Sequence, residues 1–339
     1  MADFRFQRRI MFQTAALVAG GRIAARSASA VAAQELPSGI PKLKIKSVRT
    51  YRLQHTLERP FGVSVSVPLD KTREALLVRI EADSGLVGWG ETSPINGTRA
   101  TIDQHIGPSL IGQNPIEHRR LWRQIWGANF GNALAVGAVE MAINDLRGKA
   151  LNLPIAELFG GRLRDRIPVY ASGMNYLEGK EPEDHYPVEA AALAKQGYRA
   201  MKMRLGRYPV SREKKVAAAV RAAVGPDVLL MVDGNAGYTM ESAVRMGHVL
   251  KDLEFEAFEE PLPQSPKYAG YEELRRRLPL SLAAGEAADS RASAKELIDR
   301  RAMDIIQPDV SLCGGIGEAL FIAEMAALSG IRCLPHCWG

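Results

Sequence analysis

Five polar residues recur at nearly constant spacing in the second half of this 339-residue chain, each ending or closely following a short apolar run. They are Asp233 after VLLMV, Glu259 after FEAF, Glu286 after LSLAAG, Asp309 after MDIIQP and His336 after IRCLP. Carboxylates are ligands for hard cations, and a histidine beside a carboxylate transfers protons near neutral pH. If the five side chains meet, the sequence predicts a metal-assisted acid–base site.

An alanine- and leucine-rich stretch follows each apolar run, so a strand and a helix alternate, with the polar residues 23 to 27 positions apart. Two earlier runs, RIPVYASG and YRAMKMRLG, extend this repeat, and seven strands with six helices are expected within residues 166–339. Consecutive βα units close into a TIM-type parallel barrel, whose active site lies at the carboxyl ends of the strands. Alternatively, each acid only caps the helix that follows it.

A barrel would bring Asp233, Glu259 and Glu286 to one mouth, where three carboxylates repel one another unless a hard cation lies between them. Lys202 and Arg204 stand two residues apart on an expected strand, so both cations face the same place. The pair is a candidate for proton transfer or for binding an anionic substrate.

The motifs around these residues resemble the enolase superfamily, in particular its mandelate racemase and muconate lactonizing enzyme branch. The resemblance extends from about Lys42 to the last residue, and its motifs are GLVGWGET, AVEMAINDLRGKALNLPIAELFGG, KMR, VDGN, FEEP, AAGE, QPD followed by GG, and PHC. It implies an α+β capping domain ahead of the barrel. It also implies abstraction of the proton next to a substrate carboxylate, through an enediolate stabilised by Mg²⁺.

By this resemblance Asp233, Glu259 and Glu286 hold one Mg²⁺, for which Mn²⁺ can substitute, and Asp309 pairs with His336 as in the mandelate racemase subgroup. Oxygen-only ligands favour Mg²⁺ over zinc. Asn235 and Glu260 lie beside the ligands and are expected to support them by hydrogen bonds.

Members of this family usually carry K-x-K where this chain has Lys202 and Arg204, and the second lysine is the opposing base. A guanidinium stays protonated near neutral pH, so Arg204 is a poor base. A racemase needs one base on each face of the substrate, whereas a dehydratase needs one base and one acid, and His336 can serve as both. The sequence therefore favours dehydration of a sugar or hydroxy acid over racemisation or epimerisation. An inactive metal-binding relic is the non-enzymatic alternative.

Composition and patterning divide the chain into four parts, described here with their expected roles. They are a twin-arginine signal peptide over 1–33, a linker over 34–41, the α+β capping domain over 42–160 and the barrel domain over 166–339. The first part predicts export to the periplasm; without such a signal the protein would be cytoplasmic. Its apolar stretch is too short for stable membrane insertion.

The net charge of +6 falls to +2 when residues 1–33 are left out, and no basic patch interleaved with aromatic residues is present. Nucleic acid is therefore not an expected partner. The expected partner is a small carboxylate substrate, with a homo-oligomer if the full fold is completed. The barrel is expected to be truncated after its seventh strand, as a fragment or a truncated gene product.

Overall fold

Alternating apolar and polar residues at the start of the capping domain form an antiparallel sheet, the β part of the expected α+β domain. The computed structural model describes residues 39–128 and 131–337. The first strands are β1 (Ile45–Gly62), β2 (Asp70–Ala82) and β3 (Val87–Thr92), hydrogen-bonded in the order β3-β2-β1. Leu76, Val78 and Ile80 alternate along β2 and are fully buried, because they face the helices of this domain.

After β3 the capping domain forms several helices. They are α1 (Thr98–Thr101), a π-helix (Ile102–Ile106), α2 (Gly107–Leu110), α3 (His118–Gly127), α4 (Ala133–Leu151) and α5 (Ile155–Leu158). The side chain of Asn132 accepts a hydrogen bond from the backbone N–H of Ala135 and caps α4. Most of α4 is buried, and it packs directly on β3.

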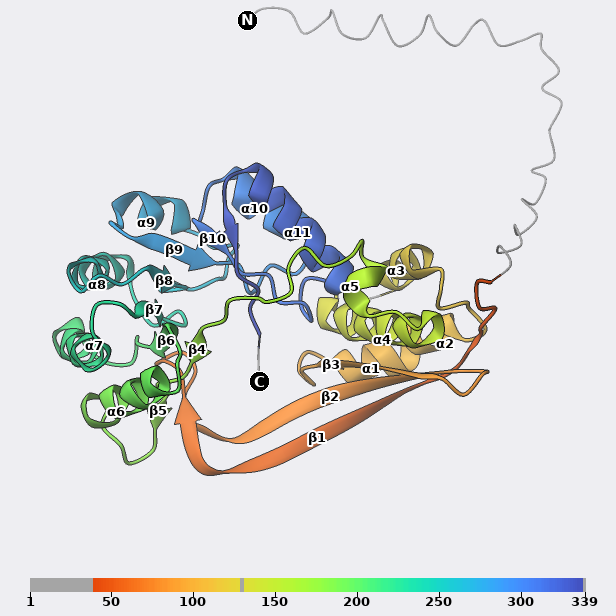
Figure 1. The fold of residues 1–339 in the computed structure, drawn as a ribbon, viewed down its shortest axis with the longest axis horizontal. Helices are drawn as coiled ribbons and strands as arrows, with labels where there is room; N and C mark the ends of the chain where they lie inside the picture. The colour runs from red at the N-terminus through yellow and green to blue at the C-terminus, as the bar shows by residue number, and fades with distance from the viewer. Residues whose placement is uncertain (1–38, 129–130, 338–339) are drawn as a thin grey trace, which may run out of the picture. The chain divides into compact units, whose positions relative to one another are not determined.

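The second half of the described chain is the parallel half-barrel that the repeat predicts. Its strands are β4 (Ala171–Ser172), β6 (Ala200–Arg204), β7 (Leu229–Asp233), β8 (Ala257–Glu259), β9 (Ser281–Ala284), β10 (Ile305–Ile306) and β11 (Arg332–Cys333). They form one seven-stranded sheet in the order β11-β10-β9-β8-β7-β6-β4, which curls as Figure 1 shows. The fold class is therefore confirmed as a capping α+β domain followed by a curled parallel sheet.

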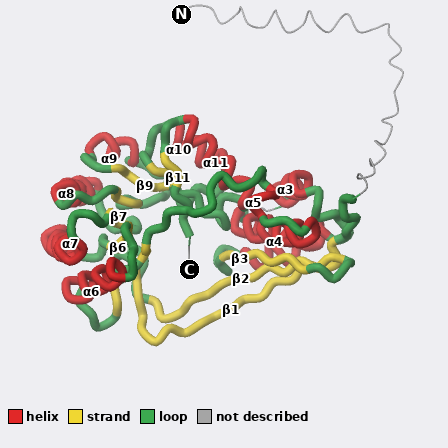
Figure 2. The backbone as a smooth tube through the Cα atoms, in the orientation of Figure 1, coloured by secondary structure: helices red, strands yellow, loops and turns green. Residues whose placement is uncertain are grey.

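Helices alternate with these strands and lie along the outside of the curl, as Figure 2 shows. They are α6 (Pro182–Lys195), α7 (Val210–Val224), α8 (Met240–Asp252), α9 (Tyr271–Arg277), α10 (Arg291–Asp299) and α11 (Ile316–Leu328). One short strand, β5 (Tyr176–Leu177), follows β4 in the chain but lies outside the parallel sheet and pairs antiparallel with the end of β1.

Side-chain alternation along the parallel strands decides which residues face the inside of the curl. Val232 and Phe258 belong to the large core shared with the helices, whereas Met231 and Ala257 belong to a small cluster within the sheet. Because side chains two apart on a strand share a face, the strand-end residue Asp233 lies on the same face as Met231.

The capping domain is fastened to the loop between β10 and α11 by buried polar contacts. The Glu140 carboxylate on α4 accepts hydrogen bonds from the backbone N–H groups of Ile316 at 2.8 Å and Gly317 at 3.1 Å, at the start of α11. Gly315 has a φ of 113°, and a Cβ there would lie 2.4 Å from the Glu140 carboxylate. Glycine is therefore required where the two domains meet.

Replacing Gly90 by alanine tests the packing of α4 on β3. A Cβ at Gly90 would lie 2.0 Å from the carbonyl oxygen of Ala138, so α4 must move. We expect the free energy of unfolding to fall by about 1–3 kcal/mol, measured by urea denaturation. Gly127→Ala is the control, because a Cβ there meets nothing within 4 Å. Equal stability of the two variants would contradict this packing.

Candidate active site

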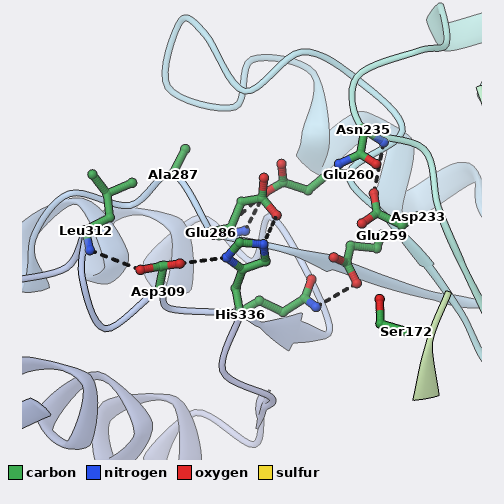
Figure 3. A network of polar contacts seen from close by, with 12 residues as sticks. Ser172, Asp233, Asn235, Glu259, Glu260, Glu286, Ala287, Asp309, Leu312 and His336 are labelled. Carbon is green, nitrogen blue, oxygen red and sulfur yellow. Dashed lines mark hydrogen bonds and ion pairs between the residues drawn. The ribbon is translucent and has the colours of Figure 1, made fainter. Parts of the chain in front are cut away.

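The polar residues at the strand ends lie side by side because the parallel strands pair in register. Arg204 pairs with Asp233, and Asp233 pairs in turn with Glu259. Asp309 and His336 form a parallel bridge further along the same edge of the sheet. Figure 3 shows the side chains of Asp233, Glu259, Glu286, Asp309 and His336 gathered in one region.

Lys202 forms ion pairs with two fully buried carboxylates of the site. Its Nζ lies 2.5 Å from Glu259 Oε1 and 3.3 Å from Asp233 Oδ2, and the side chains of both acids are 0% exposed. Burial alone would lower the pKa of Lys202, but the charges of Glu259 and Asp233 outweigh it and raise that pKa. Burial and the neighbouring Asp233 raise the pKa of Glu259 to about 7.

Arg204 on β6 contacts the Asp233 carboxylate, which lies at the end of the neighbouring strand β7. Its guanidinium contacts the Asp233 carboxylate directly, and its Nη1 donates to Asn235 Oδ1 at 3.0 Å. Burial would raise the pKa of Asp233, but Arg204 and Lys202 together lower it. The two cations therefore converge on one acid, as their spacing predicts. The backbone N–H of Asn235 also donates to Asp233 Oδ1 at 2.9 Å.

Glu286 lies on the loop after β9, and only one of its two carboxylate oxygens accepts a hydrogen bond from a described residue. Its Oε1 accepts a hydrogen bond from Gln264 Nε2 at 3.2 Å, whereas its buried Oε2 has no hydrogen-bond partner. Burial, then the charges of Asp233 and Glu259, raise the pKa of Glu286 to about 8. The charge of Asp233 therefore disfavours ionisation of both Glu259 and Glu286.

Glu260 is fully buried behind Glu286 rather than facing the mouth. Its Oε1 accepts hydrogen bonds from the Tyr268 hydroxyl at 2.9 Å and from the backbone N–H groups of Gly285 at 3.0 Å and Glu286 at 3.3 Å. Burial and then Glu286 raise its pKa to about 8. Glu260 thus fixes the backbone that carries Glu286.

His336 and Asp309 form a hydrogen-bonded pair. The distance from His336 Nδ1 to Asp309 Oδ2 is 2.8 Å, while Asp309 Oδ1 accepts from the backbone N–H and the hydroxyl of Ser311. Burial would raise the pKa of Asp309, but the hydrogen bonds from His336 and Ser311 lower it. An ionised Asp309 orients the ring with Nδ1–H toward itself and Nε2 toward Glu286 Oε2, 3.4 Å away.

Within residues 39–128 and 131–337, no three His, Cys, Asp or Glu side chains are grouped so as to enclose a metal ion. Asp233 and Glu259 share Lys202, whereas Glu286 faces His336. The donor set still suits a hard dication, because the three acids are all carboxylates on consecutive strand ends and Glu286 Oε2 has no hydrogen-bond partner. Asp233, Glu259 and Glu286 are the residues that would hold such an ion.

Sequence reasoning missed two amides and a tyrosine in this site. Gln307 Nε2 donates to Glu259 Oε2 at 2.8 Å, and Gln264 bridges Glu260 and Glu286. The Tyr170 ring centre lies 5.7 Å from Lys202 Nζ. Gln307 directly follows β10 and stands two residues before Asp309, and this strand-end position is the sequence feature that could have marked it as a site residue.

Two family models match the chain. The N-terminal domain of mandelate racemase / muconate lactonizing enzyme matches residues 46–160, and the enolase C-terminal domain-like model matches residues 186–339. A D-galactarolactone cycloisomerase of Agrobacterium fabrum is 35% identical over 303 residues, covering 88% of this chain and 79% of the relative. The chain belongs to the mandelate racemase/muconate lactonizing enzyme family of the enolase superfamily.

Relatives within this family carry the names of several enzymes. An arabinonate dehydratase of Saccharolobus solfataricus is 31% identical, covering 86% of this chain and 80% of the relative. The crystal structure of a 3,6-anhydro-D-galactonate cycloisomerase from Zobellia galactanivorans matches with a TM-score of 0.78 at 32% identity, covering 87% of this chain and 80% of that one. Further relatives are named as galactonate and rhamnonate dehydratases and as an N-succinyl-L-Arg/Lys racemase.

The predicted signal peptide over 1–33 lies outside the described residues, as does most of the linker over 34–41. Among the residues that the structure describes, no helix is both long and apolar enough to cross a membrane. Export therefore stays a prediction.

Lys202→Met tests the arrangement of buried charge. Removing the ammonium leaves Asp233 and Glu259 without their shared partner, so we expect the free energy of unfolding to fall by about 3–5 kcal/mol in chelator, measured by urea denaturation. Lys295→Met is the control, because its ion pair with Asp299 is exposed and should contribute little. Unchanged stability of Lys202→Met would contradict the pairing.

Proposed function

We propose that this protein removes the proton next to the carboxylate of a small acid and then expels an oxygen leaving group from the neighbouring carbon. The reaction class is dehydration of a sugar acid or hydroxy acid. The observation that carries the proposal is the His336–Asp309 pair, in which His336 Nε2 lies 3.4 Å from Oε2 of Glu286, one of the three proposed metal ligands.

Mg²⁺ is the proposed cofactor, with Mn²⁺ as a substitute, and Asp233, Glu259 and Glu286 would hold it. When bound, the ion supplies Lewis-acid stabilisation of the negative charge that develops on the substrate carboxylate. Glu260 supports this set from behind by fixing the backbone of Glu286.

His336 does the proton chemistry in this proposal. With Nδ1–H donated to Asp309, the lone pair of Nε2 accepts the proton from the carbon next to the carboxylate. The electron pair of that C–H bond forms the enediolate. The enediolate then collapses: an electron pair forms a C=C bond to the neighbouring carbon, and the C–O bond on that carbon breaks. The imidazolium returns its proton to the departing hydroxyl, which leaves as water. The enol that remains becomes a 2-keto acid.

Arg204 is the reason to prefer elimination over racemisation. A racemase needs a second base opposite His336, and a guanidinium does not give up its proton near neutral pH. Arg204 instead contacts Asp233 and Asn235. Lys202 remains a candidate for binding the substrate anion.

Two other functions have specific support. Relatives named as racemases keep racemisation or epimerisation open, with Lys202 as the second base. The relatives named as cycloisomerases support a variant in which the leaving oxygen of this chain's substrate belongs to a ring, so that the same two steps open that ring. A metal-binding protein without turnover would yield neither a keto acid nor solvent exchange of the substrate proton.

Glu259→Gln tests the proposed metal ligands. The change removes one charged oxygen, so we expect Mg²⁺ affinity, measured by titration calorimetry, to fall at least about tenfold, or about 1.4 kcal/mol. Glu256→Gln is the matched control, because Glu256 directly precedes the same strand at its other end and pairs with Arg332. Unaltered Mg²⁺ affinity in Glu259→Gln would count against the ligand set.

His336→Asn tests the single base. We expect it to abolish deuterium exchange from solvent into the substrate across a panel of sugar and hydroxy acids, followed by NMR. His248→Asn, on the exposed surface of α8, should exchange as the wild type does. Lys202→Ala should slow the reaction but leave exchange measurable. If exchange with one enantiomer survives in His336→Asn, a second base exists and the one-base mechanism is wrong.

A further inference from the structure

The capping-domain loop between β1 and β2 contacts the site through two serine hydroxyls. Ser64 Oγ donates to the backbone carbonyl of Asn235 at 2.8 Å, and Ser66 Oγ donates to that of Ala236 at 2.9 Å. Both acceptors lie in the barrel loop directly after Asp233. Ser64 is 0% exposed, whereas Ser66 is exposed. The two serines therefore make similar contacts in different surroundings.

Ser64 also stabilises the conformation of its own loop through hydrogen bonds. Its Oγ accepts hydrogen bonds from the backbone N–H groups of Ser66 at 3.0 Å and Val67 at 3.2 Å. A hydroxyl has one proton and two lone pairs, so all of its hydrogen-bonding capacity is used when its proton goes to Asn235. The conformation of the capping loop is thereby tied to the position of Asn235.

The turn that receives Ser64 has an unusual backbone. Asn235 and Ala236 have φ values of 37° and 58°, in the left-handed region that residues with a Cβ rarely adopt. Such a turn persists only where its surroundings hold it. The backbone N–H of Ala236 donates to the Glu260 carbonyl at 2.8 Å, and the buried Ser64 hydroxyl holds the Asn235 carbonyl, whereas water can replace the exposed Ser66 hydroxyl at the Ala236 carbonyl.

Asn235 is itself hydrogen-bonded to two charged groups of the site, Asp233 and Arg204. Its backbone N–H donates to Asp233 Oδ1 at 2.9 Å, and its side-chain oxygen accepts from Arg204 Nη1 at 3.0 Å. We propose that Ser64 is a positioning residue: its hydroxyl holds Asn235 in the conformation that orients Asp233 and Arg204. The proposal rests on the proposed function, in which Asp233 is a metal ligand.

The neighbouring barrel loop gives the capping loop a second, fixed contact. Val65 N–H donates to the Gly206 carbonyl at 3.2 Å, and Glu213 Oε1 accepts from the backbone N–H groups of Gly206, Arg207 and Tyr208. Because the buried Glu213 fixes this loop independently, loss of the Ser64 hydroxyl should loosen the Asn235 turn without undocking the whole capping loop.

The experiment compares Ser64→Ala with the matched control Ser66→Ala in the full chain. Hydrogen–deuterium exchange of the amides of residues 233–238, measured without metal, should accelerate about tenfold in Ser64→Ala. Mg²⁺ affinity, measured by titration calorimetry, should fall about tenfold. Both quantities should stay within about twofold of the wild type in Ser66→Ala, and Ser64→Thr should recover both because it keeps the hydroxyl.

Unchanged exchange in Ser64→Ala would overturn the proposal, and so would an equal effect of Ser66→Ala, since general loop docking would then be the cause. Failure of the proposed function looks different, because the wild type would bind no Mg²⁺ while the exchange result still decides the role of Ser64. Circular dichroism of Ser64→Ala checks that the chain folds. If it does not, Ser64→Thr and Ser64→Cys carry the same comparison, and wild-type exchange in Ser64→Cys would overturn the proposal, because a thiol is a weak donor.

Discussion

Negative charge buried at one edge of a parallel sheet is the constraint on which the rest of this structure depends. Asp233, Glu259 and Glu260 have fully buried side chains, and the Glu286 side chain is 16% exposed. Removing carboxylates from water costs several kcal/mol each unless partners compensate. Lys202, Arg204 and several backbone N–H groups supply that compensation. It outweighs burial for Asp233, whose pKa is lowered, but not for Glu259 and Glu286, whose pKa values are raised.

The compensation depends on regular geometry below the mouth. Parallel register sets Arg204, Asp233 and Glu259 in one row, and period-two alternation turns the two acids toward the inside of the curl. The row is continued by loops rather than strands, since Glu286 and Asp309 lie beyond the ends of β9 and β10. Because Glu286 and Asp309 lie outside the paired strands, hydrogen bonds with other residues must hold them in place. Glu260 supplies such a bond for Glu286, and Ser311 supplies one for Asp309.

Much of this arrangement was predictable from the sequence, because its causes are local. An apolar run followed by an acid and a helical stretch fixes a strand, its end and its direction, and the i, i+2 spacing of Lys202 and Arg204 fixes their common target. The hydrogen bond between His336 and Asp309 follows from adjacent strands. The individual hydrogen bonds of Ser64 to Asn235 and of Gln264 to Glu286 were not predictable, because long-range packing determines which single side chains meet. Sequence periodicity also does not predict that Asp233 and Glu259 pair with Lys202 whereas Glu286 pairs with His336.

The antiparallel pairing of β5 with β1 joins segments far apart in the chain, through Phe61 with Leu177 and Gly62 with Tyr176. The antiparallel sheet of the capping domain is thus completed by residues that follow β4, the first strand of the parallel sheet. During synthesis the capping domain emerges first, yet its last strand arrives only after the barrel has begun. Such non-local pairing slows folding, because a long loop must close before the contact forms. The two domains are therefore expected to reach their native state as one cooperative event rather than in turn.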